Sequence, residues 1–278
     1  MNKLPINGDL VGLSIDPISH SWTNRDTMLY ALGIGCRPPD DLDFIYEGRG
    51  PKVVPTFAVI PGLRAMGSAM QRIDINLAAL LHGEQSVTTH RPLPAAAEVT
   101  VEGWIAAVWD KGKAAVIEFE GIGYDTEGPL FAVRASLFVL GGGGWGGERG
   151  PSGSAASNAA PARDPDVVVE RETRPEQAAI YRLSGDMNPM HIDPDFATKA
   201  GFPGPFNHGL CTFGTVGHSV LTAWCGGDVG RFEGRFADQV WPGDTIVTRI
   251  WDEGDHAIVE ARTQRDNVVV SNGRATRR

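Results

Sequence analysis

The second half of the chain contains one long apolar stretch followed by a run of shorter ones. The long stretch predicts a helix at residues 209–224, and the shorter ones predict the strands of an antiparallel sheet. The first half repeats this order, with a helix expected near residues 56–70 and strands expected between residues 85 and 140. A helix wrapped by a curved antiparallel sheet lets both elements bury one face. The strands of the second half are expected at residues 231–236, 245–251, 257–263 and 268–271.

Two pairs of matching segments indicate that the halves are diverged copies of one unit. Residues 109–118 and 251–260 both begin with Trp-Asp and read as a strand, a turn containing glycine and a second strand. Residues 23–32 and 173–183 both begin with a threonine that can cap a helix and end on Tyr-x-Leu. Because the two pairs occur in the same order at nearly equal spacing, we predict two copies of one α+β unit.

Residues 141–165, between the two copies, consist mostly of Gly, Ser, Ala and Pro. Such a segment cannot bury enough apolar surface to form a core element, so it predicts a linker. The linker separates an N-terminal unit at residues 1–140 from a C-terminal unit at residues 166–278, and each unit has a size that is usual for a domain.

The composition of the 278-residue chain, 42% hydrophobic and 21% charged, is typical of a globular protein. No stretch approaches the roughly 18 apolar residues that cross a bilayer, and neither end carries a secretion signal or a peroxisomal address. We therefore expect no membrane association and a cytoplasmic location. The net charge of −9 argues against nucleic acid as a partner, because neutralising phosphates needs a basic surface.

The three cysteines are Cys36, Cys211 and Cys225. Their odd number and wide spacing indicate neither a disulfide framework nor a zinc knuckle. We expect all three to be small buried apolar residues in a reducing compartment.

The segment Tyr-Arg-Leu-Ser-Gly-Asp-Met-Asn-Pro-Met-His-Ile-Asp, residues 181–193, holds the first candidate chemistry. The preceding helix should stop at Ser184-Gly185, and the Asn-Pro pair that follows forces a turn. Asp186 and His191 therefore share one compact loop, where a carboxylate and an imidazole can divide an acid–base reaction between them. On spacing alone, a helix cap and a surface histidine are the commoner explanation of such a pair.

A second candidate lies at the start of the apolar helix, in the segment Pro-Phe-Asn-His-Gly-Leu-Cys-Thr-Phe-Gly, residues 205–214. The backbone N–H of Gly209 is one of the donors of the first helical turn that have no partner within the helix. Glycine allows a developing oxyanion to approach this donor and the positive end of the helix dipole. A small residue chosen for packing is the alternative. Taken with the acid–base loop, this helix start indicates a site that forms an enolate.

The two motifs, Gly-Asp-x-Asn-Pro-x-His and His-Gly-Leu-Cys-Thr-Phe-Gly, together resemble the signature of the hydratase 2 family, in the MaoC-like branch of hot-dog proteins. This family includes the hydratase part of peroxisomal multifunctional enzyme type 2, and the similarity extends over nearly the whole chain. The resemblance implies a double hot-dog fold of the α+β class and a (3R)-specific enoyl-CoA hydratase in fatty-acid or steroid side-chain β-oxidation. It implies no metal and no cofactor, because coenzyme A is part of the acyl-CoA substrate, and it favours a homodimer.

Carried onto matching positions, the resemblance implies that Asp186 and His191 form the acid–base pair. Asn188 would orient groups between them, and the Gly209 N–H would bind the thioester oxygen. The residues that the resemblance places around the substrate and its coenzyme A are His82, Gly83, Lys111, Asp186, Met187, Asn188, Pro189, Met190, His191, Gly209 and Phe236.

Comparison of the two copies separates binding from catalysis. Lys111 corresponds to Glu253 in the second copy, as expected if only the first copy binds a phosphate. Gly35 corresponds to Asp186, and no histidine follows it in residues 36–41. We therefore predict that the first copy binds substrate and that the second copy is catalytic.

Three other functions are compatible with parts of the sequence. A hot-dog thioesterase would direct water to the thioester carbonyl, and a non-catalytic acyl-CoA-binding protein would explain the inert first copy. A nucleotide-binding oxidoreductase is suggested by the glycines of residues 141–147, but these open into Arg-Gly-Pro-Ser-Gly rather than a helix, so the dinucleotide fingerprint fails. The chain also departs from the family at Phe206-Asn207, where two aliphatic residues are usual, and this change bears on the acyl pocket.

Overall fold

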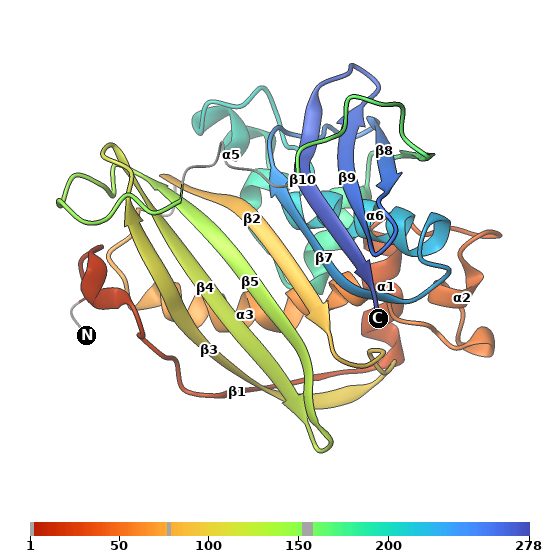
Figure 1. Cartoon of the computed structure of the whole chain (residues 1–278), viewed down its shortest axis with the longest axis horizontal. Coiled ribbons are helices and arrows are strands. Elements are labelled where there is room, and N and C mark those ends of the chain that lie inside the picture. The colour runs from red at the N-terminus through yellow and green to blue at the C-terminus, as the bar shows by residue number, and fades with distance from the viewer. Residues whose placement is uncertain (1–2, 77–78, 152–157) are drawn as a thin grey trace.

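The computed structural model describes residues 3–76, 79–151 and 158–278 (Figure 1). Its centre is one antiparallel sheet of ten strands in the order β1-β3-β4-β5-β2-β7-β10-β9-β8-β6. The strands of the first half lie on one side of the β2–β7 pair, and those of the second half lie on the other. The strands are β1 (Ile18–Trp22), β2 (Leu80–Thr89), β3 (Ala97–Asp110), β4 (Ala114–Asp125), β5 (Gly128–Leu140), β6 (Val167–Glu172), β7 (Val229–Phe236), β8 (Thr245–Asp252), β9 (His256–Thr263) and β10 (Val268–Arg277).

One long helix lies against each half of the sheet, and Figure 1 shows both on the face that is turned away from the viewer. In the first half α3 (Val59–Gln71) contacts β3 and β4, and in the second half α6 (Gly209–Ala223) contacts β7, β8 and β10. No helix of the described residues is both long and apolar enough to cross a membrane. The shorter helices are α1 (Asn24–Gly33), α2 (Leu42–Ile45), α4 (Gln177–Tyr181) and α5 (Pro194–Lys199), with 3-10 turns η1 (Gly8–Leu10), η2 (Glu47–Arg49), η3 (Pro55–Ala58), η5 (Arg182–Ser184) and η6 (Pro189–His191).

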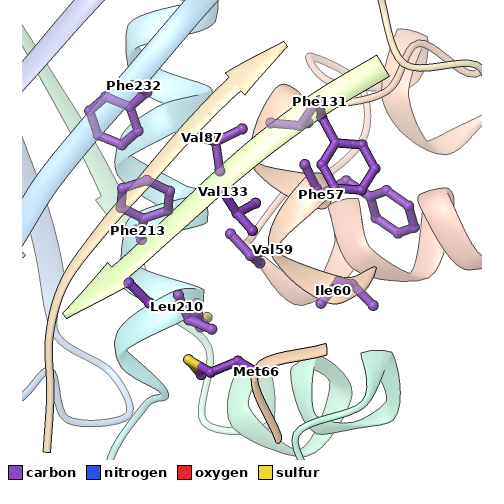
Figure 2. Close-up of a cluster of buried hydrophobic side chains, with 14 of the residues drawn as sticks. Phe57, Val59, Ile60, Met66, Val87, Phe131, Val133, Leu210, Phe213 and Phe232 are labelled. Atoms are coloured by element: carbon purple, nitrogen blue, oxygen red, sulfur yellow. The ribbon is translucent and has the colours of Figure 1, made fainter. Parts of the chain in front are cut away.

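The apolar core is continuous between the two halves, as Figure 2 shows. Val133 of β5 and Met66 of α3 belong to the first half and Leu210 of α6 to the second, yet all three lie in one buried cluster. The rings of Phe213 on α6 and Phe232 on β7 stack with their centroids 4.6 Å apart. Burial of one such side chain stabilises a fold by about 1.5–3 kcal/mol, so separating the halves would be costly.

The predicted helices and strands of both halves are confirmed, but one predicted helix start is wrong. At the start of α1 the carboxylate of Asp26 accepts a hydrogen bond from the N–H of Thr23, as the third helical residue of a capping box does, and a second one from the Thr23 hydroxyl. Thr173 caps no helix, because α4 begins only at Gln177. Its hydroxyl instead donates to the backbone oxygen of Asp244 at 2.8 Å and so holds the turn before β8.

The last strand is longer than the apolar pattern predicts. β10 continues to Arg277, past the predicted end at residue 271. Asn272, with φ of 52°, and Gly273 interrupt the apolar pattern, and the pairing of β10 shifts register at this point. A Cβ on Gly273 would lie 2.5 Å from the backbone oxygen of Val259, so glycine is what lets the strand stay paired with β9.

The first part of the predicted linker is anchored to the turn between β3 and β4. The carboxylate of Asp110 accepts hydrogen bonds of 2.8 Å from the N–H groups of Gly144, Gly112 and Gly146. These bonds lower the pKa of Asp110 to about 2, because they stabilise the charged carboxylate. Residues 152–157 of the predicted linker lie outside the described residues.

Candidate active site

Two short 3-10 turns shape the loop that carries Asp186 and His191. The first, η5, ends at Ser184 and is followed by Gly185, whose φ of 135° favours glycine. The Asp186 carboxylate then accepts from the Asn188 N–H at 3.2 Å, and the Asn188 side-chain oxygen accepts from the Met190 N–H at 3.0 Å. These two bonds fold the loop back on itself and bring the carboxylate of Asp186 within 4.8 Å of the His191 ring.

The ring of His191 is held so that one nitrogen is free to act as a base. Its Nδ1 lies 2.8 Å from the backbone oxygen of Phe206. A carbonyl oxygen only accepts, so in the neutral ring Nδ1 carries the hydrogen and Nε2 carries the lone pair. Burial lowers the pKa of His191, although the Phe206 hydrogen bond and the Asp186 carboxylate oppose this effect. A neutral imidazole with a free Nε2 can serve as a general base.

His208, the residue before α6, packs directly on His191, with ring centroids 3.9 Å apart at 35°. Its Nε2 donates to the backbone oxygen of Asp186 at 3.1 Å, and the ring of Tyr181 lies 4.9 Å away. Burial and the neighbouring His191 lower the pKa of His208 to about 3, so this ring stays neutral. The sequence does not predict a role for His208: its motif marks a helix start, and nothing in the spacing shows that its ring reaches the loop.

Gly209 is the first residue of α6, so its N–H belongs to the turn whose donors have no partner within the helix. A Cβ built on Gly209 would lie 3.5 Å from the ring of Phe236, at ordinary van der Waals distance. The protein itself therefore leaves room for alanine. Packing does not explain the glycine, whereas access of a ligand to the N–H does.

Strands β2 and β7 separate at the site. They pair over Glu84–Thr88 of β2, whereas His82 and Gly83 precede this pairing, at a point where β2 also shifts register against β5. The ring of His82 lies 5.2 Å from Phe236 at the end of β7. Burial lowers the pKa of His82 to about 4, and the nearby charge of Asp186 opposes this shift. The structure thus brings His82 and Phe236 to the acid–base loop.

Lys111 lies away from this loop, in the turn between β3 and β4, where its ammonium group donates to the backbone oxygens of Arg149 and Pro151. It lines a cavity of about 440 Å³ whose walls also include Gly83 and Arg235. The cavity lies on the sheet face opposite α3 and α6, because its lining residues alternate with the buried positions of β5 and β7. The side chain of Arg235 is exposed and forms no hydrogen bond or ion pair with the part of the chain that the structure describes.

The remaining loop residues and the three ionisable groups complete the site. Asp186, His191 and His208 each place one potential ligand atom within 4.8 Å of the others. The imidazoles of His191 and His208, however, each donate a hydrogen bond to a backbone oxygen through one ring nitrogen. This arrangement suits proton transfer. The other predicted loop residues are exposed or half-buried on the same turn: Met187, Pro189 and Met190.

Known protein families and sequences match this chain over most of its length. Residues 20–141 match the family described as MFE-2 hydratase 2 N-terminal domain, and residues 156–276 match the MaoC like domain. The chain is 40% identical over 273 residues to peroxisomal multifunctional enzyme type 2 of Mus musculus, with 94% of this chain covering 37% of that enzyme. It is 37% identical over 284 residues to enoyl-CoA hydratase ChsH3 of Mycobacterium tuberculosis, with 97% of this chain covering 98% of that protein. It is 43% identical over 259 residues to 3-hydroxyacyl-thioester dehydratase Y of the same species, with coverages of 89% and 88%.

Solved structures agree with the sequence matches. A MaoC-like dehydratase from Phytophthora capsici superposes with a TM-score of 0.87 at 31% identity, and the match covers 98% of both chains. The double hotdog protein Rv0216 of Mycobacterium tuberculosis superposes with a TM-score of 0.57 at 12% identity, over 96% of this chain and 95% of that one. The second likeness shows the fold alone. Together they confirm the predicted double hot-dog fold.

Proposed function

Because the chain belongs to the hydratase 2 branch of the MaoC-like family, we propose that it is a (3R)-specific enoyl-CoA hydratase. It is a hydro-lyase that adds water reversibly to a trans-2-enoyl-CoA and yields the (3R)-3-hydroxyacyl-CoA. Relatives matched over most of their length are named for these two directions of the reaction. The observation that carries the proposal is the fixed tautomer of His191, which leaves Nε2 free beside Asp186 and the start of α6.

Hydration begins at His191, whose Nε2 removes a proton from water. The side-chain oxygen of Asn188 is engaged by the Met190 N–H, so the amide NH₂ of Asn188 is the group that can orient this water. The water oxygen then bonds to C3 of the enoyl group, and the electron pair of the double bond moves toward the thioester carbonyl.

Negative charge on the thioester oxygen is held by the N–H of Gly209, and one such donor contributes about 3–4 kcal/mol in other enzymes. Asp186 delivers a proton to C2, which completes the addition of water. The proton held by His191 then returns to Asp186, which lies within 4.8 Å, so both groups recover their starting state. The mechanism uses no metal and no redox cofactor.

Coenzyme A, the carrier part of the substrate, is proposed to lie in the cavity on the outer face of the sheet. The cavity volume of about 440 Å³ is within the range that small-molecule sites occupy. Gly83 and the exposed Arg235 line the cavity, and their chain neighbours His82 and Phe236 lie beside the acid–base loop. A pantetheine arm can therefore pass between β2 and β7 from the cavity to the loop. Lys111 and Arg235 supply positive charge for the phosphates, Lys111 by exchanging its contacts with linker oxygens for a phosphate.

We propose a homodimer on the basis of the exposed apolar side chains of residues 183–196. Large apolar side chains gathered on one segment mark an interaction surface, and a second copy of the chain would cover them. Light scattering at micromolar concentration should give the mass of two chains, and a mass near 29.8 kDa would contradict the dimer. The cytoplasmic location stays a prediction; the mouse relative is named peroxisomal. The exposed side chains are Leu183, Met187, Ile192 and Phe196.

A panel of trans-2-enoyl-CoA substrates of rising acyl bulk tests the proposed activity. Hydration removes the absorbance of the conjugated thioester, and chiral analysis should find the 3R alcohol. Release of free coenzyme A thiol in place of hydration would identify the hot-dog thioesterase. Binding without turnover would identify a non-catalytic acyl-CoA-binding protein, and a 3S product would contradict the assignment to this family.

A further inference from the structure

A second cluster of ionisable side chains is buried at a place that the proposed reaction does not use. Cys36, Asp41 and His218 are 0%, 3% and 1% exposed. Each offers one potential metal-ligand atom, and these atoms lie within 4.8 Å of one another. Cys36 and Asp41 come from the loop between α1 and α2, and His218 comes from the middle of α6. The cluster therefore joins the first half of the chain to the long helix of the second half.

The carboxylate of Asp41 is held in a fixed orientation by groups outside the cluster. Its Oδ2 accepts from the Arg37 N–H at 3.0 Å and from the Arg171 guanidinium at 3.3 Å. Its Oδ1 lies 3.4 Å from Nε2 of His218. Such outer hydrogen bonds to one carboxylate oxygen are typical of metal-binding carboxylates, because they aim the other oxygen at the ion.

The imidazole of His218 is buried without a hydrogen-bond partner among the described residues. Neither Nδ1 nor Nε2 forms a hydrogen bond, since the approach of Asp41 does not have hydrogen-bond geometry. The ring of Phe44 packs against it in a T-shaped arrangement, with the ring centroids 4.8 Å apart. Buried polar atoms without partners are uncommon in proteins because they lose their hydrogen bonds to water. The ring of His218 thus has a nitrogen available to a ligand.

We propose that Cys36, Asp41 and His218 bind one zinc ion. Thiolate sulfur, imidazole nitrogen and carboxylate oxygen bind zinc at about 2.0–2.3 Å in a tetrahedron, which sets the ligand atoms roughly 3.3–3.8 Å apart. The three ligand atoms lie within 4.8 Å of one another, so side-chain shifts of about 1 Å or less bring them to this spacing. Zinc binding releases the proton of the Cys36 thiol, so the ion gains two negative ligands. Three protein ligands leave the fourth position to water.

The proposed ion has a structural consequence for the active site. Gly209 begins α6, and His218 lies on the same helix about two and a half turns further on. An ion held by His218 and by the α1–α2 loop would fix α6 against the first half. This loop, residues 36–41, stands in the first copy where the second copy has its acid–base loop. The copy that lost catalysis would thus position the helix that supplies the oxyanion donor.

Titration of the chelator-stripped protein with Co²⁺, followed by absorbance, tests the proposal. Thiolate coordination gives Co²⁺ a near-ultraviolet charge-transfer band, and the other potential metal group, Asp186 with His191 and His208, contains no cysteine. The band should saturate at one Co²⁺ per chain and disappear when Zn²⁺ is added. Zn²⁺ itself should raise the melting temperature by on the order of 5 °C. A wild-type protein that shows no thiolate band at millimolar Co²⁺ overturns the proposal.

Matched variants identify the ligands. Cys36→Ala and His218→Gln should lose the thiolate band and the stabilisation by Zn²⁺. Cys225→Ala, which removes a half-buried cysteine outside the cluster, and Asp186→Asn should keep both. A band that survives Cys36→Ala or vanishes with Cys225→Ala assigns the metal elsewhere and refutes the site. The wild-type titration alone can refute the proposed zinc site, so the test remains valid even if a variant fails to fold.

Discussion

Replacing Gly209 by alanine separates the two reasons for which a helix can begin with glycine. If glycine served packing, a Cβ there would collide with a neighbour. The structure instead leaves 3.5 Å between that Cβ and the ring of Phe236. Alanine in place of a helical glycine stabilises by up to about 0.5–1 kcal/mol, so we expect Gly209→Ala to melt at the wild-type temperature or about 1–4 °C higher.

Catalysis should respond in the opposite direction. The added methyl group stands where a thioester oxygen must approach the Gly209 N–H. Loss of one oxyanion donor costs about 10²–10³ in rate, and partial obstruction of the donor costs less. We therefore expect the kcat for enoyl-CoA hydration to fall by between about 10-fold and 1000-fold, while the folded protein remains at least as stable. Thermal unfolding and the absorbance assay, run on the same sample, measure the two effects.

Two glycines of the long helices provide matched controls. Gly67 on α3 has no atom within 4 Å of a built Cβ, so Gly67→Ala should stabilise similarly and leave turnover unchanged. Gly217 on α6 would place a Cβ 2.6 Å from Thr56, so Gly217→Ala should destabilise by about 1–3 kcal/mol. Wild-type turnover in Gly209→Ala would show that substrate does not approach this N–H. Destabilisation like that of Gly217→Ala would show that packing, after all, requires the glycine.

Four further predictions follow from the same geometry. Asp186→Asn and His191→Gln should each lower kcat at least about 100-fold, while calorimetry should show that a non-reactive acyl-CoA still binds. Wild-type kcat in either variant would contradict the acid–base pair. Lys111→Ala and Arg235→Ala should raise the KM for the CoA thioester with little change in kcat. The rise in KM should shrink as salt is added, because salt screens charge interactions over about 10 Å at 0.1 M. Loss of turnover at an unchanged KM would contradict a role of these two residues in binding. Burial holds the pKa of His191 below its usual value, so the acid limb of the kcat/KM profile, where the base becomes protonated, should have its midpoint below about pH 6.5. An acid-limb midpoint above about 6.5 would exclude His191 as the base. Burial also lowers the pKa of His208 to about 3, so the unfolded chain binds its proton first and stability falls as pH drops below about 6.5. At about pH 5.5 His208 should contribute about 1.4 kcal/mol to this loss, so the loss measured by denaturant unfolding should be smaller by about that amount in His208→Gln.

The fold could be predicted where burial alone decides the pattern. The long helices and most strands carry one continuous apolar face, so their positions follow from the sequence. The errors lie where a tertiary contact overrides the local pattern. Thr173 has the chemistry of a cap, yet it holds the turn at Asp244. Asn272 and Gly273 interrupt the apolar run of β10, yet the strand continues because its neighbours on both sides supply backbone partners.

The active site shows the same division. Asp186 and His191 share one loop, so chain geometry is enough to predict that they meet. His208 is distant in sequence from this loop, and its contact depends on how the start of α6 meets it, which no spacing reveals. Lys111 illustrates the converse case. Comparison of the copies predicts that Lys111 binds a phosphate, but its present partners are backbone oxygens of the glycine-rich segment, whose path the sequence leaves open.

The contrast between the two equivalent loops explains what duplication within one chain allows. A catalytic loop must stay open to substrate, and Asp186 and His191 in the second copy are accordingly only half-buried. The equivalent loop of the first copy carries no acid–base pair, and its Cys36 and Asp41 are almost completely buried. Two identical subunits could not make this exchange, because each loop would have to serve both purposes. Joined in one chain, one loop can keep the chemistry while the other holds the helix on which the chemistry depends.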